Sequence, residues 1–134
     1  MANSYVVDTH ALIWYLAGDA RLGGGAAAAM NEMDAQFYLP AIVLAEAVWI
    51  VEHNRTNIDS PKDLIAAIDA DARMIHVPLD REIVEMTVQL RSVGEMHDRQ
   101  IVATAQKLIQ RGEAVFLLSK DVDITASATV PTRW

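Results

Sequence analysis

Short apolar runs of β-forming residues alternate with longer helix-like runs along this chain, and this alternation restricts its fold more than any other feature. Strands separated by helical segments are joined by crossover connections and lie parallel. We therefore expect an α/β fold, a three-layer α/β/α sandwich around a central, mainly parallel sheet of four to five strands. The length of 134 residues suits one domain, residues 1–134. The expected strands are 5–7, 36–39, 74–77 and 114–118, with 128–131 as the candidate for a fifth.

Helical periodicity predicts helices over residues 11–16, 41–54, 61–72, 81–91 and 98–111. Ser60 and Asp80 are expected to cap two of them, and Gly112 has the residue type preferred just after a helix. The glycine-rich segment of residues 18–30 has neither Lys-Ser nor Lys-Thr after its glycines, so it does not match a phosphate-binding loop. We interpret it as a flexible connection that leads into an alanine run of high helix propensity.

Composition excludes several functional classes. The absence of cysteine excludes disulfides, thiolate nucleophiles and Cys-ligated metal sites. The net charge of −7 argues against a module that coats nucleic acid by neutralising phosphates. It is compatible with an enzyme whose acids surround divalent cations, because a bound metal reverses the local charge. No signal-peptide pattern and no long apolar run is found, so we expect a cytoplasmic protein without a membrane segment.

Asp8 stands where the apolar strand of residues 5–7 gives way to an apolar helix. In an open parallel sheet, ligands bind at the carboxyl ends of the strands, so an acid in this place has a positional reason to be functional. Capping is the competing interpretation, since Asp8 and Thr9 are both good N-cap residues.

Glu46 lies within the helical run 41–54, with apolar residues one turn before it and one turn after it. A buried carboxylate is costly unless it is paired or protonated, and no Lys or Arg lies within a turn. A site that gathers carboxylates around a cation accounts for it. The alternatives are an exposed helix face or a distant Arg partner.

Two further acids complete the set. Asp98 is expected in the first turn of the helix that ends before Gly112, where the helix dipole favours an anion. Asp121 follows the strand 114–118 and so repeats the position of Asp8, and Asp123 could substitute for it.

Four carboxylates that converge on one crevice repel one another unless cations lie among them. Mg²⁺ and Mn²⁺ are the natural choices, because these hard ions prefer carboxylate oxygen and keep exchangeable waters. Such a site supports hydrolysis of a phosphodiester, in which a water activated by the divalent metal attacks while metal stabilises the leaving oxygen.

Four segments carry a resemblance to the PIN-domain family, and more closely to the VapC-like ribonuclease toxins of bacterial toxin–antitoxin pairs. They are VVDTHALIW (Val6–Trp14), LAEAVW (Leu44–Trp49), HDRQIVATA (His97–Ala105) and LLSKD (Leu117–Asp121). The order, spacing and total length agree, and the third segment is the most specific. The resemblance implies a PIN-like fold and an Mg²⁺- or Mn²⁺-dependent endoribonuclease.

By this resemblance, Asp8, Glu46 and Asp98 match the first three family acids and would hold the metal, and Asp121 matches the more variable fourth. Ser119 stands where such toxins often have Thr or Ser, and it would orient a metal water or the scissile phosphate. Thr9 would support the site through its hydroxyl group. Arg99 would contact RNA phosphate or form a structural salt bridge, with the structural role slightly favoured, and His97 is equally ambiguous.

The resemblance also implies partners. Relatives cut single-stranded regions of RNA, several of them in transfer or ribosomal RNA. They commonly form homodimers and are silenced in toxin–antitoxin hetero-oligomers by a small antitoxin, here a VapB-like protein, and the acidic charge of this chain suits a basic partner.

Two other interpretations remain open. A non-catalytic PIN-like binding module would use the acids to hold a basic peptide. An Asp-dependent phosphatase or receiver-type domain also groups acids at strand ends. However, Asp8 is not followed by a second Asp two residues later, and the strand 74–77 ends without a suitable acid.

Overall fold

The structure is a computed structural model that describes residues 2–127 and 129–134. Five strands form one parallel sheet in the order β3-β2-β1-β4-β5. This confirms the predicted α/β fold with a central parallel sheet flanked by helices. The strands are β1 (Ser4–Val7), β2 (Gln36–Pro40), β3 (Met74–Val77), β4 (Val115–Leu118) and β5 (Thr132–Arg133).

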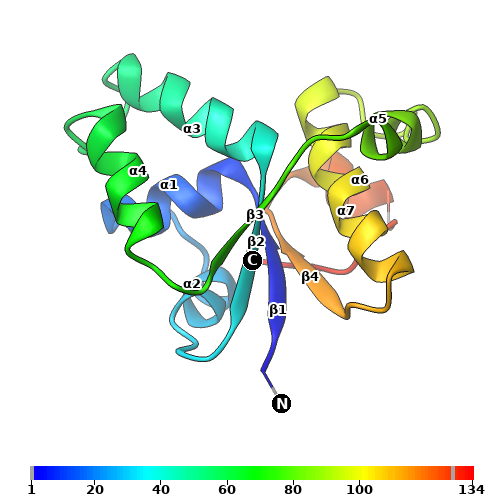
Figure 1. Cartoon of the computed structure of the whole chain (residues 1–134), viewed down its shortest axis with the longest axis horizontal. Coiled ribbons are helices and arrows are strands. Elements are labelled where there is room, and N and C mark those ends of the chain that lie inside the picture. Colours follow the sequence, from blue (N-terminus) through cyan, green and yellow to red (C-terminus); the bar gives the residue numbers. More distant parts are fainter. Residues whose placement is uncertain (1, 128) are drawn as a thin grey trace.

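Helices cover both faces of the sheet (Figure 1). In this view, with edge strand β3 in front, helices α1 to α4 lie on the left and α5 to α7 on the right, while the carboxyl ends of the strands point upward. The helices are α1 (Thr9–Ala17), α2 (Gly24–Met30), α3 (Ala41–Glu52), α4 (Pro61–Asp69), α5 (Arg81–Thr87), α6 (Met96–Gln110) and α7 (Val122–Ser127).

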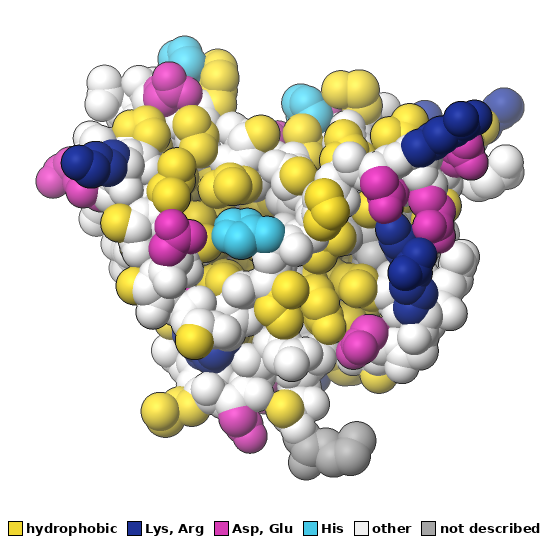
Figure 2. Space-filling model, in the orientation of Figure 1, with side chains coloured by type: hydrophobic (Ala, Val, Ile, Leu, Met, Phe, Trp, Pro, Cys, Tyr) yellow, Lys and Arg dark blue, Asp and Glu magenta, His cyan; other side chains and the backbone are white. Residues whose placement is uncertain are grey.

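The core is centred on β1, whose last three residues, Tyr5, Val6 and Val7, are fully buried. A central strand of a parallel sheet is covered on both faces, which explains why this run is continuously apolar rather than alternating. Edge strand β3 is only partly buried. Hydrophobic side chains gather over the middle of the face on its side of the molecule, with charged side chains toward both margins (Figure 2).

Local sequence signals place most helix ends. The side chains of Ser60 and Asp80 accept hydrogen bonds from Asp63 N and Ile83 N at 3.1 and 2.9 Å, so both predicted N-caps are confirmed. Gly112 has a φ of 93°, the left-handed conformation expected just after α6.

Several boundaries differ from the prediction. Helices α4 and α5 end three and four residues earlier than expected, and α6 begins at Met96 because Glu95 caps it. Helix α7 was not predicted, since six residues provide too few turns for a periodic signal. The fifth strand lies at Thr132–Arg133 rather than at 128–131, a range whose residue 128 falls outside the described part of the chain.

The glycine-rich segment is a helix start packed against the C-terminal residue, so its interpretation as a flexible connection was wrong. Gly23 is the N-cap of α2. A Cβ atom at Gly23 would lie 2.6 Å from Trp134 Nε1, and one at Gly25 would lie 2.8 Å from Trp134 O. The missing side chains therefore make room for Trp134, whose ring meets Trp14 edge-on at 5.8 Å. No helix in the described ranges has the length and apolar character needed to cross a membrane.

Candidate active site

The register of two central strands brings the first residues of the site together. Val7 of β1 is paired with Leu118 of β4, and the backbone N–H of Asp8 donates to Leu118 O at 3.3 Å. Asp8 and Ser119 therefore leave adjacent strands at the same edge of the sheet. Helices α3 and α6 contact each other above this edge and contribute Glu46 and Asp98.

All four predicted acids line one cavity of about 450 Å³, which we call the acid pocket. They come from four separate places in the fold: the end of β1, the middle of α3, the first turn of α6 and the segment after β4. Thr9 also lines the cavity, together with six residues that the sequence did not single out for it. These are the polar His10, Glu95 and Lys120 and the apolar Ile50, Ile101 and Val122.

Asp8 caps α1 and also faces the acid pocket, so capping does not exclude a role of its side chain in the pocket. Its Oδ1 accepts from Ala11 N at 2.8 Å, and the residue is only 7% exposed. Burial raises the pKa of its carboxyl group above the usual range, and the charge of Asp121 acts in the same direction. Hydrogen bonds from Ala11 and Ser119 and the nearby His10 oppose this rise. A cation in the pocket would favour the ionised form.

Glu46 is less buried than the sequence pattern suggested, because its side chain is 30% exposed at the pocket wall. The hydroxyl of Thr9 donates to its Oε1 at 2.9 Å, and Nδ1 of His97 lies 3.4 Å from its Oε2. Its polar partners thus come from α1 and α6, far away in sequence. These contacts fix the direction of the carboxylate without a Lys or Arg.

Asp98 shows the strongest sign of crowded negative charge. Its pKa rises to about 7, first because it is partly buried and then because of the charges of four other acids. These are Asp121, Glu95, Glu46 and Asp8, in order of decreasing effect. Asp98 is the third residue of α6, where Glu95 rather than Asp98 provides the cap. Capping therefore does not account for its side chain.

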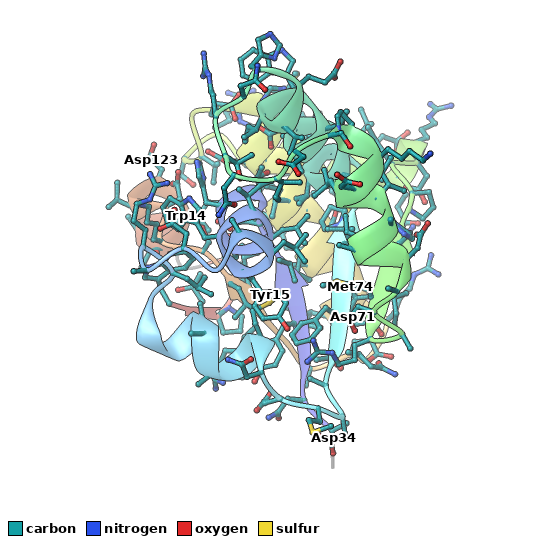
Figure 3. All side chains as sticks on the ribbon, turned by 90° about the vertical axis from the view of Figure 1, so that its left-hand side faces the viewer. Trp14, Tyr15, Asp34, Asp71, Met74 and Asp123 are labelled. Carbon is teal, nitrogen blue, oxygen red and sulfur yellow. The ribbon has the colours of Figure 1, made fainter. Side chains whose placement is uncertain are left out.

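Asp121 rather than Asp123 lines the acid pocket. Oδ1 of Asp121 accepts from the backbone N–H groups of Asp123 and Ile124 at 2.9 and 3.0 Å, so it also holds the start of α7. Asp123 is exposed on α7, near the margin of the view in Figure 3. Ser119 is 2% exposed and accepts from Asp121 N at 3.1 Å, which positions the segment that carries Asp121.

The side chains of Arg99 and His97 contact different parts of the molecule. Nε of Arg99 donates to Val93 O at 2.5 Å, in the loop before α6, and its side chain lines a separate cavity beside α5. His97 lies between Glu46 and Glu95, with Nδ1 3.0 Å from Glu95 Oε1. The structure thus gives Arg99 a local structural contact and gives His97 a contact with one of the predicted acids.

Glu95 and Lys120 were missed for identifiable reasons. Glu is not a preferred N-cap residue, so nothing in the sequence marked Glu95 as the start of α6. Lys120 follows Ser119 directly, but its direction depends on Trp14, whose ring centroid lies 4.4 Å from Nζ. In Figure 3, Trp14 lies on the same side of α1 as Asp123 of α7, whereas Tyr15 points toward Asp71.

The donor set fits a hard divalent cation. Carboxylate and hydroxyl oxygens are the main polar groups of the pocket, and burial together with the charges of the neighbouring acids raises the pKa of Asp98. However, within residues 2–127 and 129–134 no group of three or more His, Asp or Glu side chains is already arranged around one metal position. Mg²⁺ is often held by only one or two carboxylates, with water completing its shell.

A family model described as the PIN domain matches residues 5–128, which include all of the residues that line the acid pocket. The chain belongs to the PIN-domain family. The match begins in β1 and ends after α7, so it covers every element that contributes an acid to this PIN domain.

Solved structures with a similar fold include chains from VapBC, VapC and Fit proteins. A chain of Rickettsia felis VapBC2, bound to a DNA fragment from their promoter, has a TM-score of 0.67 at 12% identity, with 96% of each chain covered. Mycobacterium tuberculosis VapC20, a sarcin-ricin loop cleaving toxin, has a TM-score of 0.67 at 18% identity, with 97% of this chain and 99% of that chain covered. Neisseria gonorrhoeae FitAcB has a TM-score of 0.61 at 18% identity, with 96% of this chain and 95% of that chain covered.

At these identities the likeness shows the fold alone. No curated protein sequence matches this chain.

Proposed function

We propose that this PIN domain is a metal-dependent endoribonuclease toxin that hydrolyses phosphodiester bonds in RNA and is neutralised by a cognate antitoxin. The observation that carries the proposal is the convergence of Asp8, Glu46, Asp98 and Asp121 on one pocket at the carboxyl edge of the sheet. The similarity in fold to VapC20, which is described as a sarcin-ricin loop cleaving toxin, supports the choice of RNA as substrate.

In this proposal Asp8, Glu46 and Asp98 hold Mg²⁺ or Mn²⁺, and Asp121 contributes as the fourth acid, directly or through water. When bound, the ion supplies activation of water and stabilisation of the leaving oxygen. The pKa of about 7 for Asp98 means that part of its population is protonated near neutral pH in the free protein. Ionisation of Asp98 is therefore linked to the arrival of a cation.

Neighbouring side chains support the acids. The hydroxyl of Thr9 and the ring of His97 orient Glu46 through the contacts described above. Ser119 holds the chain that bears Asp121, and we assign it no direct contact with the ion. Lys120 is the one Lys or Arg among the described residues that line the acid pocket, and it would bind a phosphate oxygen of the substrate. Arg99 has a structural role, and Asp123 is not assigned to the site.

We propose a VapB-like antitoxin as partner, because the structural neighbours include VapBC and FitAB complexes. A basic segment of that partner would be attracted to an acidic chain of net charge −7. The partly exposed apolar surface over β3 in Figure 2 suits a second copy, so we propose a homodimer and toxin–antitoxin hetero-oligomers. The substrate class would be transfer or ribosomal RNA, cut in the cytoplasm.

One observation favours a second candidate, a non-catalytic module that uses the pocket to hold a basic peptide. Across the described ranges, the acids are not prearranged around one metal position. Metal-dependent cleavage separates the two candidates.

The test is cleavage of a mixture of structured RNAs by purified protein, with Mg²⁺ or Mn²⁺ in one arm and EDTA in the other, and with Asp98→Asn prepared in parallel. The proposal predicts cleavage that requires metal and disappears in the variant. Folded, antitoxin-free protein that binds metal and cuts nothing would favour the binding module. Full activity of Asp98→Asn would contradict the assigned site.

A further inference from the structure

A second cavity, of about 500 Å³, adjoins the acid pocket along α3. The two cavities share Glu46 and Ile50 in their linings, so a chain that crosses the acid pocket can continue directly into the second one. The second cavity is also lined by Trp49, Arg55 and His97. It therefore presents an aromatic side chain and basic groups at one end of an otherwise acidic site.

Trp49 is 48% exposed, although it lies in an apolar run that would be expected to bury it. The ring of His53 stacks against it at a centroid distance of 4.0 Å and an interplanar angle of 27°. The guanidinium carbon of Arg55 lies 4.9 Å from the centroid of the Trp49 ring. His53 thus stacks on Trp49 and the guanidinium of Arg55 lies over the same ring. We call this partly exposed group, beside the proposed cleavage site, the Trp49 stack.

The end of α3 places Arg55 in this stack. Asn54 has a φ of 55°, and the N–H groups of Asn54 and Arg55 donate to Val51 O at 3.1 Å and Ile50 O at 3.3 Å. This pattern is a Schellman motif, which commonly brings the residue at the position of Arg55 against the last turn of the helix. The side chain of Arg55 is exposed. It takes part in none of the ion pairs found in the described part of the chain.

We infer that this cavity is a nucleotide subsite for single-stranded RNA, in which Trp49 stacks on a base next to the scissile phosphate and Arg55 binds a backbone phosphate. The inference rests on the proposed ribonuclease function and extends it to substrate recognition. Single-stranded RNA is recognised by stacking of unpaired bases on aromatic rings and guanidinium planes. Arg pairs well with phosphate because its donors form a planar fork.

An RNA strand fits these features better than an apolar peptide segment does. Ile42, Ala45, Trp49 and Ile50 give the cavity an apolar wall on which a base can lie, and Arg55 supplies a cation for a phosphate. Its end at Glu46 belongs to the proposed cleavage site. Arg55 also lines a further cavity next to Trp14 and Arg21. The guanidinium carbon of Arg21 lies 4.7 Å from the ring centroid of the buried Trp14, and Arg21 is also paired with Asp19, so only Arg55 in this cavity is assigned to the proposed RNA path.

The test measures binding of a 5′-fluorescein-labelled, unstructured hexaribonucleotide by fluorescence anisotropy, with Mg²⁺ present. The full chain carrying Asp98→Asn serves as the parent, so that binding is separated from cleavage. Adding Trp49→Ala should weaken binding by about 10-fold, within the range for loss of one stacked base. Trp49→Phe should restore most of the affinity, and Arg55→Ala should weaken binding and reduce its dependence on salt.

Phe116→Ala in the same parent is the matched control. Phe116 is 38% exposed and also has an Arg guanidinium near its ring, that of Arg133 at 4.6 Å. However, Phe116 lies within β4 and lines neither the acid pocket nor the second cavity, so it should not contact the RNA. Thermal denaturation of each variant establishes that it is folded. The control should bind RNA as tightly as the parent does.

An abasic nucleotide moved along the hexamer gives a sharper readout. At one position, an abasic nucleotide should weaken binding to the parent about as much as Trp49→Ala does. The same abasic nucleotide should not weaken RNA binding by the Trp49→Ala variant any further. Equal binding of all hexamers by parent and variant would overturn the subsite and leave this surface to a protein partner. A parent that does not bind RNA would overturn it as well. If the ribonuclease proposal alone is wrong, the wild-type protein will bind RNA through Trp49 but will not cut it.

Discussion

Asp8 and Asp80 have the same local role in two different helices but opposite electrostatic surroundings. Each is an N-cap whose Oδ1 accepts from the backbone N–H three residues later, at Ala11 and Ile83. Burial raises the pKa of Asp8, whereas the hydrogen bond from Lys107 lowers the pKa of Asp80. Capping therefore explains what the two residues share but does not explain why Asp8 faces other acids.

The same contrast extends along α6. Its first turn carries Asp98 into the acid pocket, while Lys107 in its last turn and Arg111 just after it pair with Asp80 and Glu82 at the start of α5. Nζ of Lys107 lies 2.5 Å from Asp80 Oδ2 and 3.6 Å from Glu82 Oε2. One end of the helix thus pairs its charges within the protein, and the other end gathers like charges. We attribute the second arrangement to a ligand that supplies the positive charge.

The largest expected difference is in catalysis. Asp8→Asn should lower RNA cleavage by about 1000-fold or more, because the site loses several kcal/mol of charge stabilisation. Asp80→Asn should leave cleavage unchanged. Asn is as good an N-cap as Asp, so both variants should keep their helix starts. Rates of cleavage of one labelled RNA, measured side by side with thermal melts, check this pair. Equal loss in both variants would remove the distinction between the two regions.

A smaller effect is expected on stability without metal. The folded pKa of about 7 for Asp98 exceeds its ordinary value of 3.8, so the folded state binds more protons than the unfolded state between these values. Stability should therefore fall as pH rises from about 4 to 7. Asp98→Asn should avoid this loss and be about 1 kcal/mol more stable at pH 8 in EDTA, a value discounted for solvent screening.

The measurement is the difference in Tm between wild type and Asp98→Asn, about 3 °C at pH 8 and close to zero at pH 4. A variant that is less stable at pH 8 would show that the carboxylate of Asp98 has a favourable partner within the chain.

Addition of metal should reduce the difference in Tm between wild type and Asp98→Asn at pH 8. Mg²⁺ at about five times its Kd should stabilise the wild type by about 1 kcal/mol, since it binds the folded state selectively. Asp98→Asn should gain much less, and Asp80→Asn should gain as much as the wild type does. Differential scanning fluorimetry at increasing MgCl₂, with NaCl at matched ionic strength, checks this. A shift that is identical in all three proteins would indicate a general salt effect.

The smallest effect is expected at the paired end of α6. Lys107→Met keeps the largely buried stem of the side chain but removes its ion pairs, so it should cost about 0.5 kcal/mol. Chemical denaturation measures the change, and RNA cleavage should stay at the wild-type level. A strong loss of cleavage in Lys107→Met would show that the two ends of α6 are coupled.

Much of the fold could be predicted because its signals are local. Strand-forming runs, Ser60 and Asp80 as caps, and Gly112 after α6 depend on a few neighbouring residues. Helix α7 carries no periodic pattern in six residues. The packing of Trp134 on the glycines depends on a contact across most of the chain, so the sequence alone gave no indication of either feature.

In the candidate site, too, some features follow from local sequence and others depend on tertiary packing. Asp8 and Asp121 follow strands, and the carboxyl edge of a parallel sheet gathers whatever follows its strands. The contacts of Glu46 with Thr9 and His97 depend on how α3 meets α1 and α6, which no local pattern specifies. The exposed stack at Trp49 likewise depends on tertiary packing, because an apolar helical run predicts burial for this residue.

The central claim is that the acid pocket holds a divalent cation and the Asp80 region does not. Titration of metal-free protein with Mn²⁺, followed by the EPR signal of the free ion, tests it most directly. The account predicts that wild type and Asp80→Asn remove Mn²⁺ from solution, that Mg²⁺ displaces it, and that Asp8→Asn and Asp98→Asn bind it much more weakly. Equal Mn²⁺ binding by all four proteins, or binding by none of them, would contradict it.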